Sequence, residues 1–252
     1  DTNSPVGNIY KAGERFIHNF GTDNTFVGKE AGNFTMTGDG GNSVFGANAL
    51  TANTEGNSNS AFGFNALAAN LDGSSNTAIG YAAMENNTGS ISNTALGRSA
   101  LNRNTTGNFN TAVGSNTLAF NVSGDSNTAV GDMALPIATG NNNIALGASA
   151  GGGLTTGDYN IYVGSISGAA AESGQIRIGT SGDQTDCFVQ GIHANTVDSG
   201  SKELVVVDST GKLGTSNTID NLSILDNLVV CGEALFKSNV DILEDLTVQD
   251  NV

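Results

Sequence analysis

Histidine and cysteine are the residues most often used for catalysis and metal binding, and both are scarce in this sequence. The histidines are His18 and His193, and the cysteines are Cys187 and Cys231. None of them falls into a His-x-x-x-His, Cys-x-x-Cys or Glu-x-x-His spacing, the patterns that gather zinc ligands or a catalytic base at one place. The sequence therefore predicts no catalytic residue, no metal site and no cofactor.

Carboxylates recur in the glycine-rich turns, where their oxygens would be placed to hold calcium. They include Asp39, Asp72, Asp125 and Asp158. Calcium-binding β-rolls carry a denser pattern of aspartates, so calcium binding is the weaker of two interpretations, and plain turn residues the stronger. A polysaccharide-cleaving enzyme on a β-helix needs two carboxylates in one groove, whereas these acids are scattered over the turns. A non-catalytic protein is therefore favoured.

The charge balance excludes two classes of partner. The chain has 252 residues and a net charge of −15, with only 9 Lys and Arg. So few cations cannot neutralise a nucleic acid backbone, and an acidic surface is repelled by anionic membranes. No apolar stretch approaches the roughly 20 residues that span a bilayer. We therefore predict no nucleic acid partner and no membrane insertion by this segment.

A repeat organises the chain. In each copy an Asn is followed by three small or apolar residues and a Gly, and successive glycines lie 16 to 18 residues apart, most often 17. A fixed period of this length is typical of solenoids, in which each repeat packs on its neighbours. The structural repeat glycines are Gly28, Gly46, Gly63, Gly80, Gly97, Gly114, Gly131, Gly147 and Gly164.

Each unit also carries a second apolar pair shortly after its glycine, such as Ala66-Leu67 or Ala100-Leu101, and then a turn rich in Gly and Asn. Gly and Asn tolerate the positive φ of tight turns. A unit thus reads as strand, glycine corner, short strand and glycine turn, and no helical stripe of apolar residues is present. We expect an all-β solenoid whose coils pair at a spacing of about 4.8 Å.

Two features of the coil follow from residue size and register. The small Ala of the second pair and the medium-sized aliphatic residue before each Gly indicate a thin, flattened roll. The Asn residues that begin the strands would lie in register from coil to coil. They would then either form side-chain ladders or serve simply as turn residues, and the sequence leaves both interpretations open.

The chain divides into four segments on these patterns. Residues 1–20 are an N-terminal cap or docking segment with Tyr10, Phe16 and Phe20, and residues 21–180 are the repeat head. Residues 181–217 are a transition that includes a predicted hairpin over residues 203–214. In residues 218–252 apolar triplets begin every six residues, which is typical of a narrow triangular β-prism.

Such a prism is too thin to bury a core within one chain, so we expect three chains to share it as a stalk. The β-branched triplets fit poorly with a helical coiled coil, which needs a period near 3.5. The residues predicted to face the trimer axis in this stalk are Leu228, Val230, Val240, Ile242, Leu246 and Val248.

The recurring phrase Asn-Thr-Ala-(Ile/Leu/Val)-Gly, followed by Ala-Leu, resembles the head repeats of trimeric autotransporter adhesins of the YadA-head type. Residues 17–28 and 31–38, and the junction from residues 187–192 to 207–214, resemble related surface and phage tail-fibre proteins that often end in a self-cleaving chaperone domain. The resemblance implies a left-handed parallel β-roll packed as a homotrimer and followed by a stalk. The unit of about 17 residues is longer than in the best-known adhesin heads.

The resemblance and the repeat together predict an extracellular structural and adhesive fibre segment at a cell or virion surface. Its expected partners are copies of itself, in a homotrimer or an end-to-end fibre, and a receptor, matrix protein or glycan bound through the repeated turns. The alternative is a self-assembling extracellular filament or sheath subunit, or the shaft of a viral or phage tail fibre.

Overall fold

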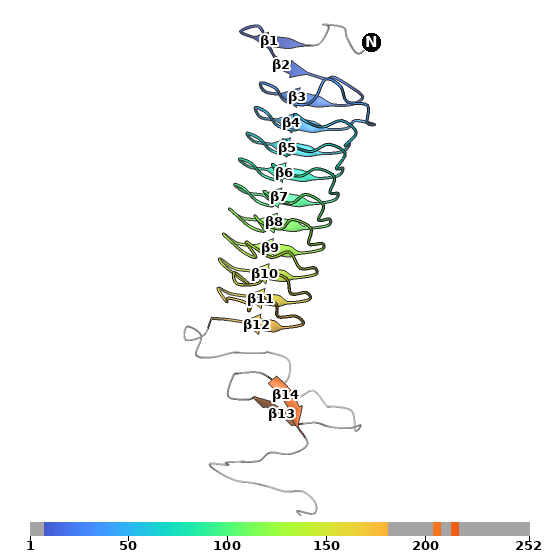
Figure 1. Ribbon diagram of the computed structural model, residues 1–252. Helices are drawn as coiled ribbons and strands as arrows, with labels where there is room; N and C mark the ends of the chain where they lie inside the picture. Colours follow the sequence, from blue (N-terminus) through green and yellow to red (C-terminus); the bar gives the residue numbers. More distant parts are fainter. Residues whose placement is uncertain (1–7, 181–203, 208–212, 217–252) are drawn as a thin grey trace, which may run out of the picture. The chain divides into compact units, whose positions relative to one another are not determined.

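The computed structural model describes residues 8–180, 204–207 and 213–216. Every regular element in these residues is a β-strand, which confirms the all-β prediction. The repeats form a β-solenoid of about nine turns of about 17 residues (Figure 1). Within the described residues, strands β1 to β12 stack in chain order into one sheet of 12 strands.

The sheet begins with an antiparallel hairpin and continues as a parallel stack. The hairpin strands β1 (Ile9–Lys11) and β2 (Glu14–His18) pair with each other, and β2 pairs antiparallel with β3. From β3 onwards each strand pairs parallel with the next. These strands are β3 (Thr25–Val27), β4 (Ser43–Phe45), β5 (Ser60–Phe62), β6 (Thr77–Ile79), β7 (Thr94–Leu96), β8 (Thr111–Val113), β9 (Thr128–Val130), β10 (Ile144–Leu146), β11 (Ile161–Val163) and β12 (Ile176–Ile178).

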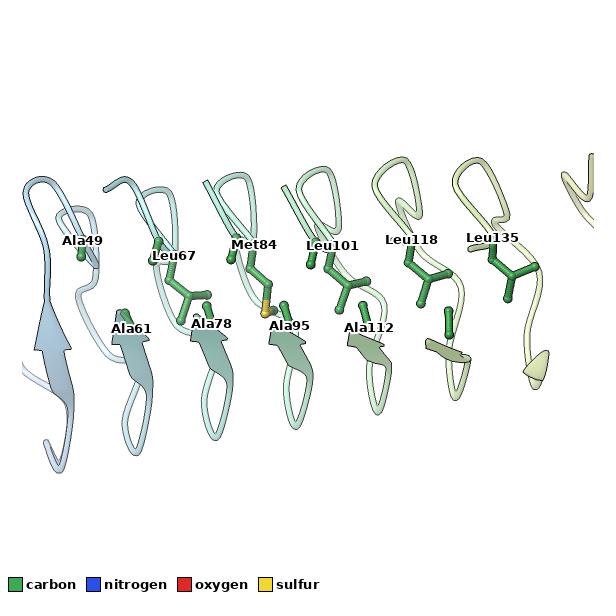
Figure 2. Close-up of a cluster of buried hydrophobic side chains, with 14 of the residues drawn as sticks. Ala49, Ala61, Leu67, Ala78, Met84, Ala95, Leu101, Ala112, Leu118 and Leu135 are labelled. Carbon is green, nitrogen blue, oxygen red and sulfur yellow. The ribbon is translucent and has the colours of Figure 1, made fainter. Parts of the chain in front are cut away.

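The core lies between this row of strands and a parallel row of turns. The middle residue of each strand points inwards, and in most coils it is an alanine such as Ala78 or Ala95, which is fully buried. Figure 2 shows the longer side chains of Leu67, Met84 and Leu101 reaching from the row of turns towards these alanines. The small strand residues thus make room for one large residue per coil, and the coil stays thin.

The second apolar pair lies in turns, so the prediction of a second short strand is wrong. At Leu67 and Leu101 the backbone φ is +53° and +50°. The N–H of Leu67 bonds to Ala83 of the next coil, whereas the N–H of Ala66 bonds back to Gly63 of its own coil. The left-handed conformation costs a non-glycine residue roughly 1–2 kcal/mol. Burying a leucine side chain yields roughly 1.5–3 kcal/mol, which offsets that cost.

The strand-initial asparagines form a ladder along the inside of the solenoid and also bond to the turns, so each of the two interpretations is right in part. The side-chain oxygen of Asn93 accepts the backbone N–H of Asn110 at 2.8 Å. The side-chain N–H of Asn110 donates to the carbonyl of Gly124 at 2.8 Å, so the same residue also closes the turn. Both asparagines are buried. An amide supplies the acceptor and the donor that a buried backbone needs at this corner.

A second row of buried asparagines lies at the next corner. The side-chain N–H of Asn70 donates to Asn53 at 2.7 Å, and that of Asn87 donates to Asn70 at 2.6 Å. Here the bonds run from amide to amide between successive coils. In the described residues no buried side-chain nitrogen or oxygen lacks a hydrogen-bond partner. The two rows therefore tie the coils together without leaving a polar group unsatisfied.

An aromatic cluster lies at the N-terminal end of the stack, and His18 and Phe20 of the segment predicted as a cap contribute to it. The His18 ring is buried, stacks on Phe26 with 4.7 Å between centroids and packs at the same distance on Phe34. Its Nε2 lies 2.8 Å from the Ala31 carbonyl, and its Nδ1 accepts the Phe20 N–H at 3.5 Å. This arrangement suits a neutral ring protonated at Nε2, because a second ring proton would face the Phe20 donor.

Acidification should loosen this cap. Burial lowers the pKa of His18 below its ordinary value of 6.5, and Arg15 lowers it further. As the pH falls, the unfolded chain therefore takes up the His18 proton before the folded chain does. The contribution of neutral His18 to the free energy of unfolding is fully present above pH 6.5 and is lost as the pH falls towards the folded-state pKa. We expect an NMR titration of the His18 ring to give a pKa below 6.5. The variant His18→Phe should lose the pH dependence, and an unshifted titration would contradict the assignment.

The last coils replace the apolar core with a polar cluster. Tyr162 is buried and its hydroxyl donates to Glu172 at 2.7 Å. Arg177, from the middle position of β12, donates to the same carboxylate at 2.6 Å. The Arg177 guanidinium and the Tyr162 hydroxyl outweigh burial and lower the pKa of Glu172. A charged residue thus takes the middle position of the last described strand of the stack, where the earlier strands carry an apolar residue.

The chain divides into two compact units, Asp1–Cys187 and Phe188–Val252. In the second unit β13 (Leu204–Val207) pairs antiparallel with β14 (Leu213–Ser216), which confirms the predicted hairpin. The predicted stalk over residues 218–252, with its six proposed axis residues, lies outside the described residues.

Candidate interaction surface

The outer face of the sheet carries a continuous row of apolar side chains, which we call the apolar column. Its members are the last residues of the strands, each directly before a corner glycine, and they pair in register from coil to coil, as Leu96 does with Val113. Phe45, Leu96 and Leu146 are 58%, 45% and 50% exposed. The column consists of Val27, Phe45, Phe62, Ile79, Leu96, Val113, Val130, Leu146, Val163 and Ile178.

The sequence analysis used the size of these residues as an indication of a thin roll, whereas the structure places their side chains on its outer face. The smaller residue of each Thr-Ala-aliphatic strand, such as Ala95, is buried, and the larger one is exposed, as Leu96 is, or half-buried, as Val113 is. This order is the reverse of the usual tendency for large aliphatic residues to lie inside. The sequence of a three-residue strand does not reveal which residue faces inwards, because both faces of the strand carry apolar groups and the alternation of polar and apolar residues is too short.

The column is larger than the apolar surface that soluble monomers usually expose. If each side chain exposes roughly 70 Å², the column exposes roughly 700 Å², against roughly 300–600 Å² for the largest patch on a typical monomer. Its border is polar on one side, where Thr77, Thr94 and Thr111 begin their strands and point to the same outer face. An apolar patch with a polar rim is typical of a protein interface.

The corner glycines fix the position of this column against the coils. At Gly97 the backbone φ is +139°, and a Cβ there would overlap the carbonyl oxygen of Gly114 in the next coil. Gly114 has a φ of +134° and the same relation to Gly131. The repeat glycines predicted from the sequence therefore lie where successive coils make backbone contact. Their spacing keeps the residue before each of them in register.

Directly after the corner glycines, two neighbouring coils of the described stack carry exposed aromatic residues. Phe64 and Tyr81 stack with 5.6 Å between their centroids and are 44% and 55% exposed. The equivalent positions in neighbouring coils carry Ala47, Arg98 and Ser115. This corner position therefore accepts side chains from alanine to tyrosine without a change of coil.

Two of the four carboxylates weighed as calcium ligands, Asp125 and Asp158, bond to the turns. One oxygen of Asp125 accepts the backbone N–H of Asn108 at 2.6 Å, and one of Asp158 accepts that of Asn141 at 2.6 Å. Each therefore joins two neighbouring coils. The described residues contain no group of three or more His, Cys, Asp or Glu side chains placed to hold a metal ion. They also contain no helix that is long and apolar enough to cross a membrane.

The sequence and structure were compared with known proteins. No family model, curated protein or solved structure matches the chain. The functional argument therefore rests on the chain's own surface.

Proposed function

We propose that this chain is a non-catalytic structural segment of an extracellular fibre, in which three copies associate side by side along the apolar column. The observation that carries the proposal is the unbroken register of this exposed column over the whole parallel stack. A row that follows the solenoid axis matches a second copy lying parallel to it. The resemblance to adhesin heads independently favours the same arrangement.

The energy available from the column suffices for association. Burying roughly 700 Å² of apolar surface yields roughly 17 kcal/mol per copy as an upper estimate. The loss of translational and rotational freedom costs roughly 4–15 kcal/mol, and mutual repulsion of acidic chains adds to it. The balance favours association when most of the column is covered. Two copies packed face to face would also cover the column, and it is the resemblance to trimeric adhesin heads that favours three.

The adhesive part of the proposal concerns the turns. In a trimer built on the column, the turns that follow the second row of asparagines point away from the shared axis. They display side chains such as Phe109, Val122 and Tyr159, which are 58%, 44% and 67% exposed. A receptor, a matrix protein or a glycan would bind there. The turn itself recurs in every coil, while its side chains vary, from Ser92 to Phe109 at one position, so a partner would meet a repeated backbone with distinct side chains.

A second candidate, an end-to-end filament or sheath subunit, is favoured by the edges of the sheet. Among the described residues, β1 and β12 each pair with one strand only, so each leaves one backbone edge without a strand partner. Unpaired edges are templates for another chain. A tail-fibre shaft would use the same coils and belongs to this group of elongated assemblies.

Negative-stain electron microscopy of the purified chain separates the two candidates. The fibre-segment proposal predicts discrete short rods of uniform length, because side-by-side association ends at the ends of the solenoid. Fibres of indefinite length would favour the filament, and compact single particles without a rod shape would contradict both.

A further inference from the structure

A groove lies at the N-terminal end of the apolar column, and we call it the hairpin groove. Its volume is about 500 Å³. One wall is the tip of the β1–β2 hairpin, and the other is formed by the corners of the first two coils around Gly28 and Gly46. Val27 and Phe45, the first two residues of the column, line it directly. The groove is therefore continuous with the proposed interface.

Cations are concentrated at this groove. Lys11, Arg15 and Lys29 line it together with one carboxylate, Glu14, so cations outnumber acids there in a chain of net charge −15. Two of these cations have a partner within the chain. The Lys11 Nζ lies over the Phe16 ring, 5.5 Å from its centre, and the Lys29 Nζ lies 3.6 Å from a carboxylate oxygen of Glu30. The remaining walls are mainly apolar. The groove thus combines an apolar floor with a cationic rim.

The column by itself does not determine how far one copy is shifted along another. Its side chains repeat at every coil, so a shift by one coil, about 4.8 Å, restores nearly the same apolar contacts. Regular pairing without a distinct feature permits several registers. The hairpin and its groove are where the periodic surface ends, since β1 and β2 run antiparallel to each other at the top of the parallel stack.

We infer that the hairpin groove sets the axial register of the assembly by receiving the outer strand β1 of a neighbouring copy. Ile9 and Tyr10 of β1 are 56% and 50% exposed. In a parallel assembly without a shift, a neighbour's hairpin lies at the level of the groove. Glu14 and Glu30 of that neighbour then lie at the level of the cationic rim. A shift by one coil would move all of these groups away.

This inference rests on the proposed association and adds its register. Filling the groove should disturb the register and leave the coil intact. Ala47 lines the groove, and its equivalents Phe64 and Tyr81 show that the position holds an aromatic side chain. Ala47→Trp is therefore the blocking variant. Ser115→Trp places the same side chain at the equivalent corner outside the groove and is the control. Tyr10→Ser removes the proposed occupant and should act like Ala47→Trp.

Cysteine cross-linking reports the register. In a background with Cys187→Ser and Cys231→Ser, chains carrying Val113→Cys or Val130→Cys are mixed, so that same-residue and one-coil-shifted links compete. We expect same-residue links in roughly tenfold excess for the otherwise unchanged chain and for Ser115→Trp, since a preference of 1.4 kcal/mol corresponds to a factor of about ten. For Ala47→Trp and Tyr10→Ser the ratio should fall towards one.

Two other outcomes are distinguishable. An unchanged excess of same-residue links in both Ala47→Trp and Tyr10→Ser would overturn the inference and leave the proposed association standing. Absence of any link between copies in the otherwise unchanged chain would overturn the association, and with it the inference.

Discussion

Replacing Gly97 by Val should destabilise the solenoid by about 3–5 kcal/mol, close to the upper end of single-residue effects. The backbone φ of +139° is one that residues with a Cβ rarely adopt. The added Cβ would also overlap the carbonyl of Gly114 in the next coil. Relief would require two coils to separate, which breaks the ladder of asparagine bonds on either side. Chemical denaturation followed by circular dichroism measures the loss.

Ser115→Ala is the matched control for this substitution. Ser115 directly follows a corner glycine on the same surface, and its equivalents differ widely in size and charge. Its replacement should change the free energy of unfolding by less than about 0.5 kcal/mol. Gly114→Val should repeat the effect of Gly97→Val, because Gly114 makes the same contact one coil further on. Small and equal effects at all three positions would show that the corners tolerate a side chain.

The double substitution Leu96→Asp with Val113→Asp should abolish association while the coils remain folded. Both side chains point outwards, so the carboxylates stay in water in a single copy. In a trimer three carboxylates would gather at each of two neighbouring levels of the shared axis, and burying unpaired charges costs several kcal/mol each. We expect the molecular mass to fall to that of one chain, with a β-type circular dichroism spectrum retained.

The control for this variant adds the same charge away from the column. Thr106→Asp with Ser123→Asp places two carboxylates in exposed turns of the neighbouring coils. This protein should associate like the unchanged chain. If both double variants dissociate equally, net charge rather than the column controls association.

The sequence predicted the solenoid because its period depends on residues with few alternatives. Gly97 and Gly114 occupy positions where a Cβ would overlap the next coil, and Asn93 and Asn110 bond both to the next coil and to their own turn. Such residues recur at every turn, so spacing alone reveals them. The β13–β14 hairpin was predicted for the same reason, from a strong local pattern.

The parts that sequence reasoning missed depend on orientation and on contacts between distant residues. A leucine at a positive φ, as at Leu67, is locally unfavourable, and only its burial compensates for the cost. Because the sequence does not show this compensation, the Ala-Leu pair was predicted as a strand and not as a turn. The outward direction of Leu96 was hidden by its apolar character. The hairpin groove joins residues 11–16 to residues 45–47, and no pattern in either segment indicates that they meet.

Light scattering of the unchanged chain in physiological salt tests the central claim most directly. The proposed association predicts a mass of about three times 25.4 kDa, or a larger multiple if trimers join end to end. A stable folded species of 25.4 kDa at all concentrations would contradict it, because the apolar column would then remain in water without a partner.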